Sequence, residues 1–113
     1  MTPDALLEFC LALPQAVETF PFDDETSVFK TSGNGKMFAL SILDGHPLSI
    51  SLKCDPDDSL ALQGEYPQIT PGYHLNKKHW ITVVLDGSVP GELVEQLIQA
   101  SHALVRPKVP RGS

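Results

Sequence analysis

The sequence predicts an α+β fold, an antiparallel sheet of about five strands with helices packed on one face. Residues 48–54 and 80–86 alternate in side-chain character, as strands with two different faces do. Short turns join the first strands in succession, which favours antiparallel pairing. Three further segments combine helix-starting residues with apolar residues at helical spacing. The expected order is helix, four strands, helix, strand, helix.

The first helix is expected to begin at Thr2-Pro3-Asp4, which supplies a hydroxyl cap, a proline at the first helical position and an acid. Pro14 ends it. Its buried stripe is expected to consist of Leu6, Phe9, Cys10 and Leu13. The four strands that follow are expected within 16–22, 27–31, 36–43 and 48–54. An acidic, solvated turn at 23–25 and turns at 33–35 and 44–47 separate them.

The second helix is expected to begin at Asp55-Pro56 and to stop at Gly64. Residues 66–72 then form a loop that ends in a Pro71-Gly72 turn. A strand follows over 80–86, and Ser88 is expected to cap the last helix. The predicted core face of that helix consists of Leu93, Leu97, Ile98, Ser101, Leu104 and Val105.

Length and composition indicate one globular domain over residues 1–109. Residues 110–113 are a tail, similar to a protease-site remnant of an expression vector, with a native tail as the alternative. No run approaches the roughly 18 apolar residues of a membrane span, and no secretory signal is evident. We therefore expect a cytoplasmic protein, monomeric and not associated with a membrane. Cys10 and Cys54 are expected to be buried free thiols.

The net charge of −6 is unevenly distributed. Residues 1–25 carry acids and no lysine or arginine, whereas 26–54 and 66–85 carry a small excess of lysine. Tight non-specific DNA binding depends on neutralising phosphates, so an acidic chain argues against it. A local basic face remains compatible with weak, salt-sensitive contact.

The stretch Tyr73–Trp80 concentrates the chemically distinctive residues of the chain. One interpretation is structural: Asn76 forms a turn, and Tyr73 and Trp80 clamp the loop. The other is recognition, in which cations contact phosphates while Asn76 or an aromatic ring touches a base. The candidate nucleic-acid-binding residues are Asn76, Lys77, Lys78, His79 and His74, with Lys30 and Lys53 on the polar sheet face, where Ser49 and Ser51 also lie.

Metal binding and catalysis fit the sequence less well. His74 and His79 lack further ligands at suitable spacing, and His102 lies on a helix without a ligand-spaced partner. Ser49, Ser51 and Thr82 lie in strands without a nucleophile elbow. No phosphate-binding glycine motif is present. We therefore expect no metal, no cofactor and no catalytic residue.

The residues Tyr73-His74-Leu75-Asn76-Lys77-Lys78-His79-Trp80, followed by Leu85-Asp86-Gly87-Ser88, resemble the MmcQ/YjbR family of small bacterial proteins. Phe20-Pro21-Phe22-Asp23, Lys36-Met37-Phe38-Ala39 and Cys54-Asp55-Pro56 follow the same pattern, so the resemblance covers residues 3–109. Gly91 departs from it, because an acid is usual there.

This resemblance implies a CyaY-like (frataxin-like) α+β fold with a double-wing arrangement and a DNA-binding role. The resulting hypothesis is a non-enzymatic domain that binds DNA weakly. The alternative is a module that binds a protein or a small ligand.

Overall fold

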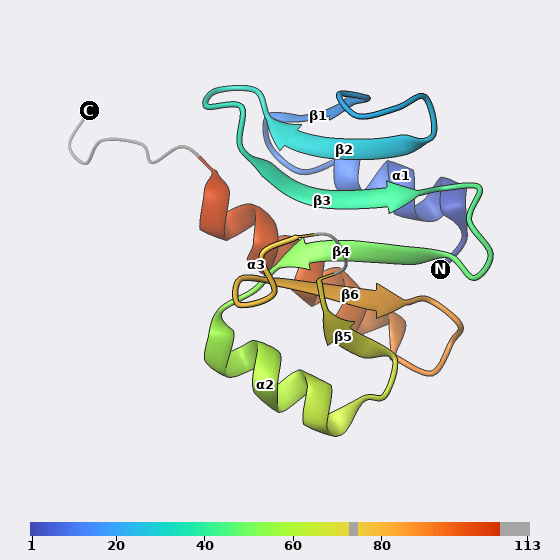
Figure 1. Ribbon diagram of the computed structural model, residues 1–113. Coiled ribbons are helices and arrows are strands. Elements are labelled where there is room, and N and C mark those ends of the chain that lie inside the picture. The colour runs from blue at the N-terminus through green and yellow to red at the C-terminus, as the bar shows by residue number, and fades with distance from the viewer. Residues whose placement is uncertain (73–74, 107–113) are drawn as a thin grey trace.

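The computed structural model describes residues 1–72 and 75–106, which form an antiparallel sheet and three helices. The strands are β1 (Ala16–Thr19), β2 (Thr26–Thr31), β3 (Met37–Ile42), β4 (Ser49–Lys53), β5 (Ile69–Pro71) and β6 (Trp80–Val84). They lie in the order β1-β2-β3-β4-β6-β5 (Figure 1). Helices α1 (Pro3–Leu11) and α3 (Gly91–Val105) cover one face, and α2 (Pro56–Glu65) packs beside β5. The predicted α+β class and antiparallel sheet are confirmed.

Two of the three predicted helix starts are also confirmed. Thr2 Oγ1 accepts a hydrogen bond from Ala5 N (3.1 Å), and Asp55 Oδ1 accepts one from Asp57 N (2.9 Å). The third prediction is wrong, because α3 has Pro90 as its N-cap and no side-chain cap. Ser88 belongs to the preceding turn, where its N–H donates to Asp86 Oδ1 (2.9 Å).

The sequence did not predict β5, so the sheet has six strands where about five were expected. Its residues pair with β6, Ile69 opposite Val83 and Pro71 opposite Ile81. Gly72 N continues the ladder by donating to Trp80 O (2.9 Å), so the expected Pro71-Gly72 turn is wrong. Pro71 is tolerated because β5 is an edge strand. Three residues are too few to show an alternating pattern.

The ends and faces of the two later helices also differ from expectation. Gly64 lies inside α2, which continues to Glu65. In α3 the buried stripe consists of Val94, Ile98, Ser101, His102 and Val105. Leu104 was expected in the core and is 59% exposed. Positions 94, 98, 101 and 105 follow the helical repeat, and residue 104 lies beside that stripe.

The hydroxyl of Ser101 joins α3 to the middle of the sheet. Ala39 and Leu52 pair between β3 and β4, so Phe38 and Lys53 would come next in that ladder. Ser101 Oγ instead donates to Phe38 O (2.5 Å) and accepts from Lys53 N (2.9 Å). Since Ser101 is fully buried, water cannot take the place of its hydroxyl in these two hydrogen bonds. The hydroxyl therefore completes the hydrogen bonding of two strands from the helix.

We expect Ser101→Ala to lower the free energy of unfolding by about 1–3 kcal/mol, because it leaves a buried N–H and a buried carbonyl without partners. Chemical denaturation would measure the loss. Ser32→Ala is the control, since Ser32 is exposed, and should change stability by less than about 0.5 kcal/mol. Equal stability of the two variants would show that the Ser101 bridge does not support the fold.

Candidate functional site

The turn before β6 is organised by Asn76. Its side-chain Oδ1 accepts from Lys78 N (3.0 Å), and its carbonyl accepts from His79 N (3.1 Å) and Trp80 N (3.0 Å). Lys77, Lys78 and His79 are all exposed on this turn. Tyr73 and His74, the other candidates in this stretch, lie outside the described residues. The turn thus presents two lysines and a histidine to solvent from a short hydrogen-bonded frame.

Trp80 pairs with Lys53 across the sheet and is only 6% exposed. Gly72 lies directly behind it, and the Lys53 Nζ lies 6.0 Å from the centre of its ring, within range of a cation–π contact. A base could not stack on a ring so well covered. The Trp80 backbone is also part of the turn, since its N–H donates to Asn76 O (3.0 Å) and its carbonyl accepts from Gly72 N (2.9 Å).

The sheet face opposite α1 and α3, which we call the open face, brings distant lysines to one end. Lys30 follows the core residue Phe29 on β2, and Lys53 follows the core residue Leu52 on β4, so both side chains point to the open face. Lys53 pairs with Trp80, and the 76–79 turn precedes Trp80. Lys30 is the second-last residue of β2 and lies at the same end of the sheet. We call Lys30, Lys53, Lys77, Lys78 and His79 the cationic end.

Acidic residues accompany both ends of the sheet. Asp23, Asp44 and Asp86 lie in the connections at the end opposite to Lys30 and Lys53, as the strand directions in Figure 1 show. Asp55 and Asp58 follow β4 and line, with Lys53, a second groove of about 340 Å³ between α2 and α3. The lysines are thus separated from Asp23 along the open face but not from the start of α2.

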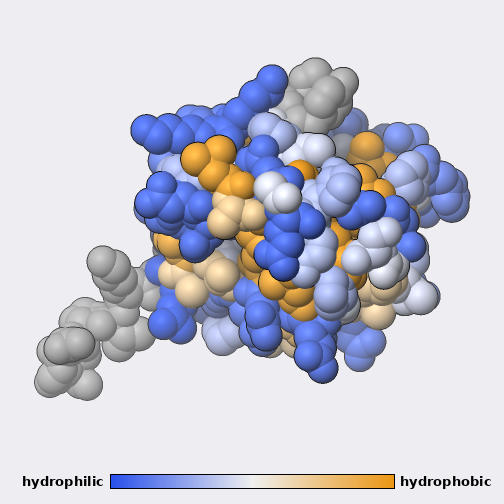
Figure 2. All heavy atoms as spheres, turned by 90° about the horizontal axis from the view of Figure 1, so that it is seen from below, coloured by the Kyte–Doolittle hydropathy of each residue, from blue (hydrophilic) through white to orange (hydrophobic). Residues whose placement is uncertain are grey.

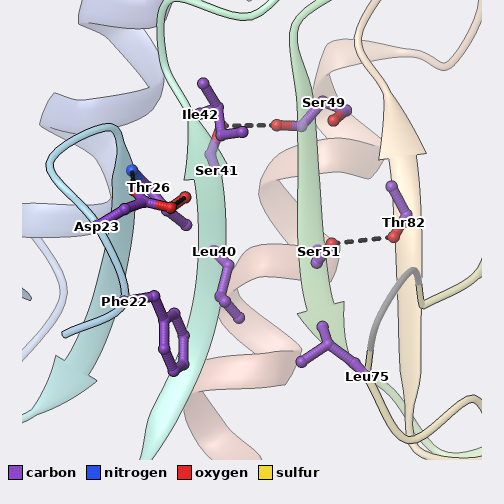
Figure 3. A pocket seen from close by; sticks show the side chains of 10 residues that line it. All are labelled: Phe22, Asp23, Thr26, Leu40, Ser41, Ile42, Ser49, Ser51, Leu75 and Thr82. Carbon is purple, nitrogen blue, oxygen red and sulfur yellow. Dashed lines mark hydrogen bonds between the residues drawn. The ribbon is translucent and has the colours of Figure 1, made fainter. Parts of the chain in front are cut away.

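A groove of about 530 Å³ lies on the open face (Figure 3). Its floor comes from β3, β4 and β6, and its walls from the segment before β2 and from Leu75. We call it the open-face groove, and it is lined by Phe22, Asp23, Thr26, Leu40, Ser41, Ile42, Ser49, Ser51, Leu75 and Thr82. The sequence predicted the uncovered face and not the groove, because Phe22 and Leu75 are brought together only by the fold.

Hydrogen bonds already occupy several hydroxyls of this groove. Ser41 Oγ donates to Ser49 O (2.6 Å), and the hydroxyls of Ser51 and Thr82 share a hydrogen bond (2.9 Å). Neither Ser51 nor Thr82 is thereby arranged as an activated nucleophile, which would need an adjacent base. The groove lining thus combines apolar side chains with hydroxyls.

The two cysteines are buried free thiols, as predicted. Burial raises the pKa of Cys10 to about 12. Burial, with the nearby carboxylates of Asp58 and Asp55, raises the pKa of Cys54 to about 11. Both sulfurs are therefore protonated and weakly nucleophilic at neutral pH.

The histidine of α3 also has a packing role. His102 is buried, its Nε2 lies 2.8 Å from the Pro14 carbonyl, and its ring meets Phe38 edge-on. Within residues 1–72 and 75–106, no group of three or more His, Cys, Asp or Glu side chains is arranged to hold a metal ion.

The surface seen from the side of α2 is mostly hydrophilic, with apolar atoms exposed in separate groups (Figure 2). In the part of the chain that the structure describes, no helix has the length and apolar character needed to cross a membrane.

Comparison with known proteins gives consistent matches along the chain. A family model described as YjbR matches residues 11–104. YbdF of Escherichia coli O157:H7 is 47% identical over 96 residues, which is 84% of this chain and 76% of YbdF. YjbR of Escherichia coli K12 is 34% identical over 103 residues, 90% of this chain and 85% of that protein. Both relatives are described as uncharacterised.

Solved structures share the fold. The crystal structure of Deinococcus radiodurans DR2400, a DUF419 domain, has a TM-score of 0.88 at 44% identity, covering 98% of this chain and 93% of that one. A crystal structure from Pseudomonas syringae has a TM-score of 0.82 at 29% identity, covering 94% and 100%. The fold described above is therefore shared with proteins from other bacteria.

We expect Gly72→Ala to destabilise the protein by roughly 1–3 kcal/mol, because a Cβ there would lie 2.6 Å from the Trp80 Cβ. Gly64→Ala is the matched control: its Cβ would meet nothing within 4 Å, and alanine is the better helix former by about 0.5–1 kcal/mol. Urea denaturation of both variants would measure the difference. Opposite signs are expected, and a neutral Gly72→Ala would contradict the close packing of Trp80.

Proposed function

The chain belongs to the YjbR family of small bacterial proteins, and we propose that it is a non-enzymatic domain that contacts DNA weakly through its cationic end. The observation that carries this proposal is the antiparallel register. It brings Lys30 and Lys53, which are far apart in sequence, to the end of the open face from which the 76–79 turn projects. Lysines grouped in this way can contact successive phosphates.

The chemistry of the turn supports contact with phosphate. Lys77, Lys78 and His79 are exposed on a frame fixed by Asn76, so little conformational freedom of the backbone is lost on binding. Lysine contacts phosphate as a compact charge and carries no base preference. The expected binding is therefore insensitive to sequence.

The overall charge of −6 and the carboxylates at the start of α2 limit the affinity for DNA. A protein that neutralises only a few phosphates binds non-specifically, with a dissociation constant on the order of 10⁻⁴ M at moderate salt.

The chemistry of the nucleophilic side chains supports a non-enzymatic role. In the described residues both thiols are protonated, and the Ser51 hydroxyl is hydrogen-bonded to that of Thr82.

A second candidate function is favoured by the open-face groove. Its volume of about 530 Å³ lies in the range of small-molecule sites, roughly 300–1,000 Å³. Its lining combines apolar side chains with a few polar groups, as such sites do. Binding a small ligand in the groove and binding DNA at the cationic end use different residues, so the two functions can be tested separately.

We expect titration with short single-stranded and duplex DNA at low salt to shift the amide resonances of residues 75–79 and of Lys30 and Lys53. Lys78→Glu should abolish most of this response. Arg106→Glu is the matched control, because it changes the net charge by the same amount at an exposed residue beyond the end of α3. A Lys78 variant should also reduce the salt dependence of the affinity by about one unit of slope.

Two results would contradict DNA contact through the cationic end. One is an unchanged spectrum for residues 75–79 at saturating DNA. The other is an equal loss for Lys78→Glu and Arg106→Glu, which would mean that only the total charge matters.

A further inference from the structure

Among the described residues that line the open-face groove, Asp23 carries the one charged side chain, and its oxygens are hydrogen-bond acceptors. We propose that this groove binds a small organic cation, a protonated amine carried on an apolar body. The inference rests on the second candidate function, ligand binding in the groove, and does not depend on DNA contact.

Asp23 is held as a carboxylate at the wall of the groove. Its Oδ1 accepts from Glu25 N (2.8 Å) and Thr26 N (2.6 Å), and its Oδ2 accepts from Thr26 Oγ1 (3.0 Å). These hydrogen bonds keep the pKa of Asp23 below its usual value, so it is ionised at neutral pH. A carboxylate has about four lone-pair sites, and one therefore remains for a donor on a ligand.

The neighbouring Thr26 hydroxyl presents a further acceptor to the groove. Its hydrogen is directed to Asp23, so its oxygen can still offer a lone pair to a ligand. An ammonium group has three N–H donors and one positive charge, and it matches this arrangement. Of the lining residues within 1–72 and 75–106, an anion would meet the Asp23 carboxylate and no lysine, arginine or histidine.

The apolar part of the groove accounts for the rest of the ligand. Phe22 is 62% exposed and Ile42 is 47% exposed, so both have surface to cover. In Figure 3 the side chains of Phe22, Leu40 and Leu75 lie along one side, while Asp23 and Thr26 lie toward the other. Phe22 directly precedes Asp23 in the sequence, and the face of an aromatic ring attracts cations. The ammonium group would therefore lie at Asp23 and the apolar body over Leu40 and Leu75.

The test is an NMR titration with three ligands of nearly the same shape: 2-phenylethylamine, 2-phenylethanol and 3-phenylpropionate. The amine is expected to shift the resonances of residues 22–26, 40–42, 49–51 and 82. The neutral alcohol should bind on the order of tenfold more weakly, as expected for loss of one charge-assisted hydrogen bond. The anionic ligand, 3-phenylpropionate, should leave these resonances unmoved.

Asp23→Asn is the principal variant, because an amide oxygen can still accept from the Glu25 and Thr26 backbone while the charge is removed. It should reduce the affinity for the amine about tenfold and leave that for the alcohol unchanged. Asp86→Asn is the matched control. Asp86 is likewise exposed and accepts a turn hydrogen bond from Ser88 N (2.9 Å), but it lies outside the groove lining. This control should bind the amine as the parent protein does.

Phe22→Leu provides a second variant that keeps an apolar wall and removes the ring. It should weaken the amine more than the alcohol, since only the amine gains from the aromatic face. Equal affinity for amine and alcohol, or equal loss in the Asp23 and Asp86 variants, would overturn the proposal. Binding of a lysine-containing peptide without binding of the amine would overturn the assignment to a small molecule.

Discussion

The hydrogen bonds of Ser101 are the constraint on which the site most depends. At the point where β3 and β4 stop pairing directly, a helix hydroxyl takes over the link between the Phe38 carbonyl and the Lys53 N–H. The link holds the backbone of Lys53, whose side chain lies on the open face over Trp80. Burial makes the interaction obligatory, because an unpartnered backbone group in the core costs about as much as the hydrogen bond itself. A helix on one face thereby fixes the geometry of the other.

The open face carries two kinds of chemistry at different positions. Its cationic end projects lysines from β2, β4 and the 76–79 turn. Its groove has an ionised carboxylate at one wall and beside it the Thr26 hydroxyl, whose hydrogen is directed to that carboxylate. The two regions share no residue. A polyanion and a small amine could therefore use the same face without competing for the same residues.

Sequence reasoning succeeded where a residue acts locally. Thr2 and Asp55 cap helices by accepting from N–H groups two or three positions away, so adjacent residues in the sequence are enough to predict the interaction. It failed where the partner is remote. β5 is too short to show a pattern and exists because β6 supplies its hydrogen bonds. Leu104 lies beside the stripe of α3 that is buried against the sheet, and the sequence does not show which stripe that is. The open face could be inferred from the alternation of 48–54. The groove could not, since Phe22 and Leu75 come to line the same groove only after folding.

The distinctive stretch before β6 also changes in meaning once its surroundings are known. Trp80 and Asn76 are among its most recognisable residues, yet the Trp80 side chain is buried. The side-chain and carbonyl oxygens of Asn76 accept hydrogen bonds from backbone N–H groups. Gly72 is required because Trp80 leaves no space for a side chain. These residues fix the conformation of the turn before β6 through hydrogen bonds and close packing, and such contacts tolerate few substitutions whatever ligand the protein binds. The atoms able to meet a ligand are less conspicuous: the ammonium groups of Lys77 and Lys78, and the Phe22-Asp23 wall far away in sequence. Residues that identify the family therefore need not be the residues that perform its function.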